Sequence, residues 1–226
     1  MPSLDHIVYL LRAKSPWVYG TVEVAGRAVT AMRYAKRIRH ALAVATIRGT
    51  VHEAPAVVRP IGPADTNDLV RMLATIPDEY LTFFHPHRVD PTSLKAVLSR
   101  KTVLTYGLYI AGQLSGYGLL KLFPTGKAYH GRLIVPELAN QGLGKFLARY
   151  LNWQVSLLGF QPCATVHRDN LASLNSQVAT RPYKVVAELP NDFRLLMFSM
   201  DVVDVQKPEL FVPIPQRRPT ESVSVC

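Results

Sequence analysis

Two glycines and a lysine, Gly142, Gly144 and Lys145, lie between an apolar segment and a strong helical pattern. Glycine lets the backbone turn tightly and leaves its N–H groups free to point at an anion. The first N–H groups of the following helix have no intrahelical partner and lie at its positive end. Lys145 adds a cation beside them. The pattern therefore predicts a site for a diphosphate group, formed mainly by main-chain amides.

Other nucleotide-binding folds have glycine-rich turns with a different spacing. A dinucleotide-binding turn has a third glycine three residues after the second, and Leu147 stands at that position. A P-loop has four residues between its glycines, whereas only Leu143 separates the two glycines here. The spacing disfavours both of these folds.

The segments around this turn have the periodicity of an α/β domain with a mixed sheet. Ala111 and Gly112 predict a hairpin between two of its strands. The predicted order is β-α-α-β-β-β-α-β-α-β-β. The predicted strands cover residues 56–61, 103–110, 113–123, 127–135, 162–166, 184–189 and 193–202, and the predicted helices cover residues 66–73, 92–98, 142–158 and 170–179.

Two segments of this pattern resemble a known family. Residues 139–144 are similar to the Arg/Gln-x-x-Gly-x-Gly/Ala turn that follows the fourth strand of the GCN5-related N-acetyltransferases (GNAT). Residues 166–173 resemble their fifth strand and the Asn-x-x-Ser start of the next helix. The resemblance spans roughly residues 56–203. It implies an enzyme that binds acetyl-CoA and transfers the acetyl group to an amine within a ternary complex.

The resemblance also implies a cofactor site. Main-chain groups at the end of the fourth strand would hold the pantetheine arm and stabilise the oxyanion, the turn would hold the diphosphate, and the Asn-x-x-Ser start would contact the arm. The implied cofactor-binding residues are Leu133, Ile134, Val135, Asn140, Gln141, Gly142, Leu143, Gly144, Lys145, Asn170 and Ser173.

Two positions depart from the family pattern. Ala139 stands where the family has Arg or Gln, which removes a side-chain contact but leaves the main-chain amides. Gln177 stands where the family often has the tyrosine that protonates the leaving thiolate. A glutamine cannot be that acid, so either the role is empty or another group, such as Tyr183, fills it.

Histidines near the predicted acceptor site are candidates for proton transfer. Some family members have a catalytic histidine at the position of His130, which makes it our predicted general base; the alternative is a histidine satisfied by its neighbours. A loop containing Phe83, Phe84, His85 and His87 is expected to bind the acceptor, or to pack on the core through its phenylalanines. His85 and His87 are too close together for a metal site, and we expect no metal.

The flanks of the chain differ from this central part. Residues 1–55 form a predicted basic helical extension, and residues 204–226 a proline-rich tail that is not expected to continue a sheet. The net charge is +10, and the two cysteines fit a reducing compartment. No apolar run reaches the roughly 18 residues of a membrane span, and the N-terminus lacks the pattern of a secretory signal. These features favour a cytoplasmic protein.

A basic amphipathic helix is predicted over residues 28–45. We favour a helix docked on the main domain or a homodimer contact. Contact with an anionic membrane surface and binding of nucleic acid remain as alternatives, and the sequence contains no nucleic-acid-reading motif.

Three functions are open at this point. We favour acetylation of a small-molecule amine, with an amino sugar as one example, because of the aromatic and histidine-rich loop. The first alternative is acetylation of a protein or peptide amine. The second is a non-catalytic acyl-CoA sensor with a basic anchor helix, which Ala139 and Gln177 favour.

Overall fold

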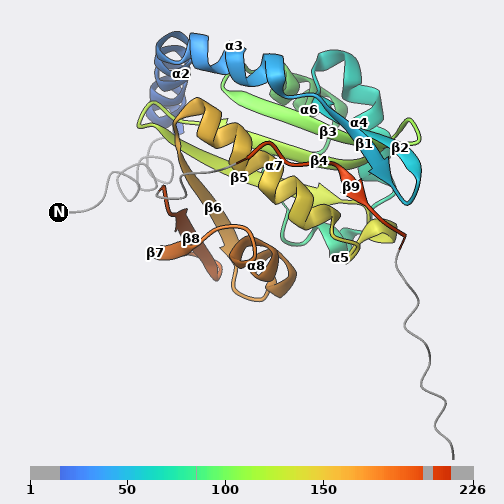
Figure 1. Ribbon diagram of the computed structural model, residues 1–226. Helices are drawn as coiled ribbons and strands as arrows, with labels where there is room; N and C mark the ends of the chain where they lie inside the picture. The colour runs from blue at the N-terminus through green and yellow to red at the C-terminus, as the bar shows by residue number, and fades with distance from the viewer. Residues whose placement is uncertain (1–15, 85, 201–205, 215–226) are drawn as a thin grey trace, which may run out of the picture.

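The computed structural model describes residues 16–84, 86–200 and 206–214 (Figure 1). These residues form a nine-stranded mixed sheet with the strand order β7-β8-β6-β5-β4-β3-β2-β1-β9. The strands are β1 (Ile47–Val51), β2 (Ala54–Pro60), β3 (Val103–Ile110), β4 (Gln113–Leu122), β5 (Lys127–Ile134), β6 (Gln161–His167), β7 (Tyr183–Leu189), β8 (Phe193–Phe198) and β9 (Phe211–Val212).

Helices cover both faces of the sheet. The α-helices are α2 (Pro16–Arg33), α3 (Ala35–Val44), α4 (Thr66–Ala74), α5 (Asp78–Leu81), α6 (Pro91–Leu98), α7 (Leu143–Leu158) and α8 (Leu171–Val178), with short 3-10 helices η1 (Pro63–Asp65) and η2 (Pro136–Leu138). Helices α3 and α7 pack in one core cluster with the sheet, and α4 and α6 pack in a second cluster on the opposite face. None of the described helices is long and apolar enough to cross a membrane.

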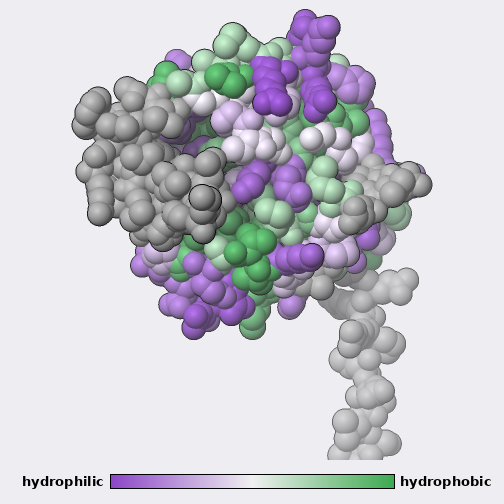
Figure 2. Space-filling model, turned by 90° about the vertical axis from the view of Figure 1, so that its left-hand side faces the viewer, coloured by the Kyte–Doolittle hydropathy of each residue, from purple (hydrophilic) through white to green (hydrophobic). Residues whose placement is uncertain are grey.

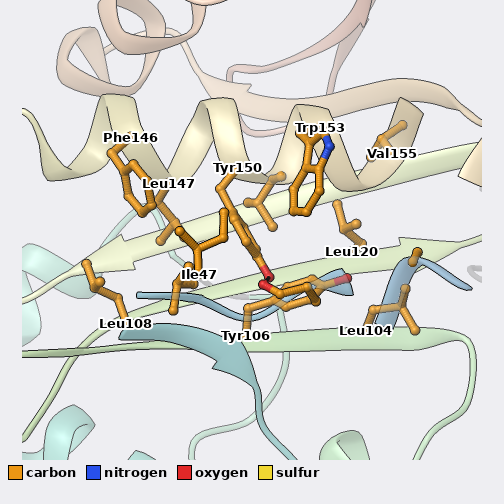
Figure 3. Packing of buried hydrophobic residues seen from close by; sticks show 14 of the residues in the cluster. Ile47, Leu104, Tyr106, Leu108, Leu120, Phe146, Leu147, Tyr150, Trp153 and Val155 are labelled. Atoms are coloured by element: carbon orange, nitrogen blue, oxygen red, sulfur yellow. Dashed lines mark hydrogen bonds between the residues drawn. The ribbon is translucent and has the colours of Figure 1, made fainter. Parts of the chain in front are cut away.

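The larger core lies between α7 and strands β3 and β4 (Figure 3). Tyr106 and Tyr150 are fully buried there, with their ring centroids 5.1 Å apart in an edge-on arrangement. The Tyr150 hydroxyl donates a hydrogen bond of 2.8 Å to the Ala45 carbonyl at the end of α3. This bond joins α3 to α7, which is the helix that follows the glycine-rich turn.

Residues 34–51 contribute to this core. Instead of the single helix predicted over residues 28–45, α2 ends at Arg33 and α3 begins at Ala35, so that prediction is wrong at Tyr34. The Ile38 and Ala41 side chains are buried in the core that contains α7, in agreement with the interpretation of a docked helix. Strand β1, which was not predicted, pairs antiparallel with β2.

The C-terminal segment adds a strand that the sequence did not predict. β9 pairs in parallel with β1, and the amides of Thr50 and His52 donate to the carbonyls of Leu210 and Val212 at 2.9 and 2.8 Å. Figure 1 shows this segment crossing α7 before it reaches β1. We call residues 206–214 the strap. The expectation that the tail contributes nothing to the sheet is therefore wrong for these residues.

The opposite end of the sheet is formed by β7 and β8, with α8 beside them. Figure 2 views this end and shows apolar residues between hydrophilic ones on its surface. Leu171, Val185 and Val186 are among the exposed apolar residues of α8 and β7. Strand β6, next to β8, forms one wall of the opening described below.

Candidate active site

Strands β5 and β6 diverge and leave an opening in the middle of the sheet. They pair in parallel only at Lys127, Ala128 and Tyr129 of β5, and the described residues show no pairing beyond this point. The Val135 amide donates to Ser115 of β4 at 3.0 Å, so the odd-numbered residues of β5 bond to β4. Because the direction of main-chain groups alternates along a strand, the even-numbered residues direct their N–H and C=O groups towards β6.

This alternation decides which amides face the opening. They belong to Arg132 and Ile134, the even-numbered residues that lie beyond the last parallel pair, Tyr129 with Cys163. The amides of Leu133 and Val135, which we predicted to hold the pantetheine, point instead towards β4, and that of Val135 is already bonded there. Of the three predicted residues only Ile134 directs its amide towards the opening, as Arg132 also does, and contact of these amides with a cofactor stays a prediction.

The glycine-rich turn lies at the end of β5 and begins α7. Gly142 is the residue before the helix and has a φ of 86°, which favours glycine, and no side chain caps the helix there. The first intrahelical bond runs from the Phe146 amide to the Gly142 carbonyl, so the amides of Leu143, Gly144 and Lys145 have no intrahelical acceptor. A Cβ added at Gly142 or Gly144 would meet no atom within 4 Å. The turn leaves room for an anion against these amides.

A groove of about 690 Å³ extends from this turn along α7. Its walls are α7 residues from Gly142 to Asn152, Thr180 and Arg181 after α8, and residues 206–213 of the strap. Four basic side chains and one acidic side chain line it, namely Lys145, Arg149, Arg181, Lys207 and Glu209. The groove is thus positively charged and suits an elongated anionic ligand.

Several buried polar groups lack a partner among the described residues, and two of them, Asn152 and Arg181, line this groove. Asn152 is 3% exposed with both amide atoms unpaired, and Arg181 is 4% exposed with Nε unpaired. His130 is 6% exposed with both ring nitrogens unpaired, and Gln177 is 2% exposed with Oε1 unpaired. Buried polar groups are normally hydrogen-bonded, so this pattern indicates a polar ligand in this groove.

His130 lies on the groove face of the sheet. The row of β5 residues that contains it also contains Ala128, which packs in the α7 core. Burial first, and then the positive charges of Arg132 and Arg181, lower the pKa of His130 to about 3. The imidazole is therefore neutral and weakly basic at pH 7.

An aromatic cluster covers the opposite face of the opening. The Phe84 ring contacts Tyr117 edge-on at 6.2 Å, and a Cβ at Gly131 would lie 3.6 Å from it. Phe83 stacks on His167 at the end of β6, with ring centroids 4.8 Å apart. The loop between α5 and α6 therefore spans from β4 to β6 across the opening.

His87 lies in this loop and bonds to both sides. Its Nδ1 is 2.9 Å from the Arg88 carbonyl and its Nε2 is 3.1 Å from the Tyr117 hydroxyl. A carbonyl can only accept, so Nδ1 carries the proton, and the lone pair of Nε2 accepts a hydrogen bond from the Tyr117 hydroxyl. Burial lowers the pKa of His87. The predicted acceptor residue His85 lies outside the described residues.

Comparisons with known proteins identify the fold. No family model matches the chain, and no curated protein matches it in sequence. Among solved structures, the GNAT domain of S. lividans PAT matches with a TM-score of 0.60 and 16% identity, over 68% of this chain and 96% of that one. The chain has the GNAT fold.

Two further structures with the GNAT fold support the same conclusion. The ribosomal-protein-S5-alanine acetyltransferase from Vibrio fischeri has a TM-score of 0.54 and 13% identity, over 68% of this chain and 95% of that one. AAC(6')-Ib in complex with paromomycin and acetyl-CoA has a TM-score of 0.51 and 17% identity, over 63% and 92%. The predicted fold class is confirmed, and the order of elements over residues 56–198 agrees with the prediction apart from the short helix α5 and the two 3-10 helices.

The other predicted residues of this GNAT fold occupy different environments. Asn170 caps α8, because its Oδ1 accepts from the Ser173 amide at 3.0 Å; their contact with a cofactor stays a prediction. Lys145 is exposed beside the turn, whereas the Leu143 side chain is fully buried, so only the Leu143 main chain is available to a ligand. The Gln141 side chain donates to the Glu137 carbonyl at 2.9 Å.

Sequence reasoning missed Asn152 and Arg181, which line the groove, and Arg132 of β5, which is on the same side of the sheet. Arg132 was visible as a charged residue within an apolar strand, but its side of the sheet depends on the pairing with β4. Asn152 and Arg181 lie far apart in sequence and meet only because α7 and the end of α8 border the same groove.

Proposed function

We propose that this protein is an acyl-CoA-dependent N-acyltransferase that transfers an acyl group, in the simplest case acetyl, to an amine of a small molecule. One observation carries the proposal. A basic groove headed by an uncapped helix N-terminus begins after β5, which diverges from β6, and an aromatic and histidine-containing loop covers the other face of the sheet. A CoA thioester fits the first side, and an amine fits the second.

In this arrangement the diphosphate binds to the amides of Leu143, Gly144 and Lys145. The pantetheine arm follows the groove and brings the thioester to the opening. Main-chain N–H groups of Arg132 and Ile134 face the opening and supply hydrogen bonds to the oxyanion that forms when the amine attacks. Fixed amides of this kind stabilise the transition state without reorganisation, which is why we assign them this role.

The amine must lose a proton during the transfer. The two histidines that could accept it lie on different faces of the sheet. His130, our predicted base, lies on the groove face with a pKa of about 3, so its basicity at neutral pH is low. His87 lies on the loop face, and its unprotonated Nε2 accepts a hydrogen bond from the Tyr117 hydroxyl. We propose His87 as the proton acceptor, acting directly or through that hydroxyl, with His130 as the alternative.

The leaving group requires no acid in this proposal. Gln177 is buried at the position where the family often has a tyrosine, and an amide cannot donate a proton to sulfur. The CoA thiolate leaves as the anion and takes its proton from water. This assignment accounts for the glutamine without placing a second acid in the opening.

Small amines and protein amines are both precedented among similar folds. AAC(6')-Ib was crystallised with paromomycin and acetyl-CoA, and the Vibrio fischeri protein is named for a ribosomal protein. The loop that carries Phe83, Phe84 and His87 packs closely over the opening, which favours a small acceptor over a protein segment. Acetylation of a protein amine is the second candidate function.

Two measurements test the proposal. Calorimetry on the folded protein is expected to register binding of CoA and acetyl-CoA, and a thiol-release assay is expected to show turnover stimulated by some members of an amine panel. Absence of heat for both CoA compounds contradicts the proposal. Binding without stimulation by small or peptide amines would instead identify a non-catalytic acyl-CoA sensor.

A further inference from the structure

Helix α2 has polar groups on the side that contacts the rest of the protein. Glu23 forms an ion pair of 3.6 Å with Lys121 of β4, and a Cβ at Gly26 would lie 3.6 Å from Pro124. Thr30 is fully buried and its hydroxyl donates to the Gly26 carbonyl at 2.7 Å. A helix on the surface of a protein in water normally has the opposite arrangement, with its apolar side against the core and its polar side outside.

The outer side of α2 is apolar over the described residues. All the exposed residues between Glu23 and Arg33 are alanine, valine or methionine, and they recur at helical spacing. We call this row the α2 stripe, and its members are Val24, Ala25, Ala28, Val29 and Met32. The exposed fractions of Val24, Val29 and Met32 are 57%, 46% and 72%. Single exposed apolar residues are common, but a continuous exposed row indicates a surface that contacts something other than water.

Basic side chains follow the α2 stripe directly. The exposed cations at the end of α2 and on α3 are Arg33, Lys36, Arg37 and Arg39. Arg33 and Arg37 lie 5.4 and 5.9 Å from the ring centroid of Tyr34, which joins the two helices. None of the four cations forms an ion pair with a described acidic residue, and the sequence has no acidic residue from 24 to 52. Their counter-charge must therefore come from outside the described chain.

The two helices lie away from the candidate active site. Figure 1 shows α2 and α3 meeting at an angle at one end of the molecule, whereas α7 begins towards the other end. No residue of α2 or α3 lines the basic groove. Ile38 and Ala41 are buried against α7, which holds the basic side of α3 towards solvent. A partner on this surface would leave the groove open.

The charge of this surface favours an anionic lipid bilayer over a protein partner of the same kind. In a two-fold dimer of this chain the cations of both copies would approach one another, and the net charge of +10 adds to that repulsion. Stable protein contacts also bury roughly 800 Å² on each side, which is a large area for three longer side chains and two alanines. A helix with one apolar side and neighbouring cations suits the interface of a bilayer, because only that side needs to enter it.

We propose that α2 and α3 bind the surface of an anionic bilayer. The α2 stripe enters the boundary between head groups and acyl chains, and Lys36 and Arg39 lie near the lipid phosphates. The inference goes beyond the acyltransferase proposal and does not depend on it. Each basic side chain near such a surface contributes about fivefold to the partition coefficient, so attachment by this short stripe is reversible.

Flotation of the full chain with lipid vesicles tests the inference. Partition onto vesicles of phosphatidylcholine and phosphatidylglycerol should exceed partition onto phosphatidylcholine alone by about tenfold or more, and should fall as salt is added. The double variant Val29→Ser/Met32→Ser should reduce partition about tenfold through lost apolar contact. Lys36→Gln and Arg39→Gln should each reduce it about fivefold.

Two control variants make the same chemical changes elsewhere. Val186→Ser removes an apolar side chain of β7 that is 45% exposed, close to the 46% of Val29. Lys95→Gln removes an exposed cation of α6, on the opposite face of the sheet from α3. Both controls should leave partition unchanged, and a loss as large as that of the matched variants would overturn the inference.

Three other results would also overturn it. The first is equal partition of the wild-type chain onto the two kinds of vesicle, or no partition at all. The second is undiminished partition of the Val29→Ser/Met32→Ser variant, because another segment would then attach the chain. The third is a wild-type dimer that becomes a monomer in that variant, which would assign the α2 stripe to a second copy. Thermal melts establish folding, and the comparison of vesicles with the wild-type chain decides the matter where a variant does not fold.

Discussion

Replacing Gly144 by alanine should stabilise the protein and weaken its binding of CoA. Gly144 is the second residue of α7 and is not among the residues with positive φ, and an added Cβ meets no atom within 4 Å. Glycine inside a helix is less favourable than alanine by about 0.5–1 kcal/mol. For a chain of this size that gain corresponds to a rise in Tm of about 1–4 °C.

The methyl group at Gly144 would occupy the open space in front of the helix amides. A diphosphate could then no longer approach them closely and would lose at least one hydrogen bond to a charged group, worth about 1.5–3 kcal/mol. The Kd for CoA is therefore expected to rise about tenfold to a hundredfold. Calorimetry with CoA and a thermal melt of the same sample measure the two effects together.

Gly62→Ala is the matched control, because an added Cβ there also meets no atom within 4 Å and the residue lies outside the groove. It should leave CoA affinity unchanged. An unaltered Kd in a well-folded Gly144→Ala protein would refute the placement of the diphosphate at this turn. A fall in Tm would show that the space in front of Gly144 is not open.

Three further predictions concern other parts of the chain. In Gly49→Val the new Cβ would lie 1.8 Å from the Leu210 carbonyl oxygen, so the strap should detach from β1. The expected signs are faster hydrogen exchange of the β1 amides and a lower affinity for CoA. Unchanged exchange would contradict the described contact. In the folded protein the pKa of His130 is about 3, below its ordinary 6.5, so between these pH values the unfolded chain binds one proton more than the folded chain. The free energy of unfolding should therefore fall by up to about 1.4 kcal/mol per pH unit as the pH drops from 6.5. His130→Leu should lessen that slope in urea titrations. His87→Gln should lower kcat/KM about a hundredfold or more and remove the acidic limb of the pH–rate profile, and an unchanged profile would return the role of base to His130.

The central elements were predictable because their patterns are local. Strands with continuous apolar residues, such as β3 and β4, and the helix that follows Gly142 have lengths and boundaries that sequence periodicity can indicate. Strand β1 was missed because only Ile47 and Val51 are buried in it, with Arg48 and Gly49 between them. Strand β9 is two residues long, and pairing with β1 across more than 150 positions leaves no local signal.

The candidate site was predictable where it depends on the main chain of a turn, and less so where it depends on register. The spacing of Gly142 and Gly144 is sufficient to predict the glycine-rich turn. The direction of the Leu133 and Val135 amides depends on which residues of β4 they pair with, and the sequence alone does not show this register. Asn152 and Arg181 border one groove only through the packing of α7 against the end of α8.

The strap has a consequence for how shortened versions of this chain would behave. It satisfies the amides of Thr50 and His52, which without β9 would form the free border of an eight-stranded sheet. Removing residues 206–226 would leave these donors unpaired beside the apolar residues that Leu210 covers. An unprotected strand of this kind accepts a strand from a neighbouring molecule, so a truncated protein should self-associate in a concentration-dependent manner.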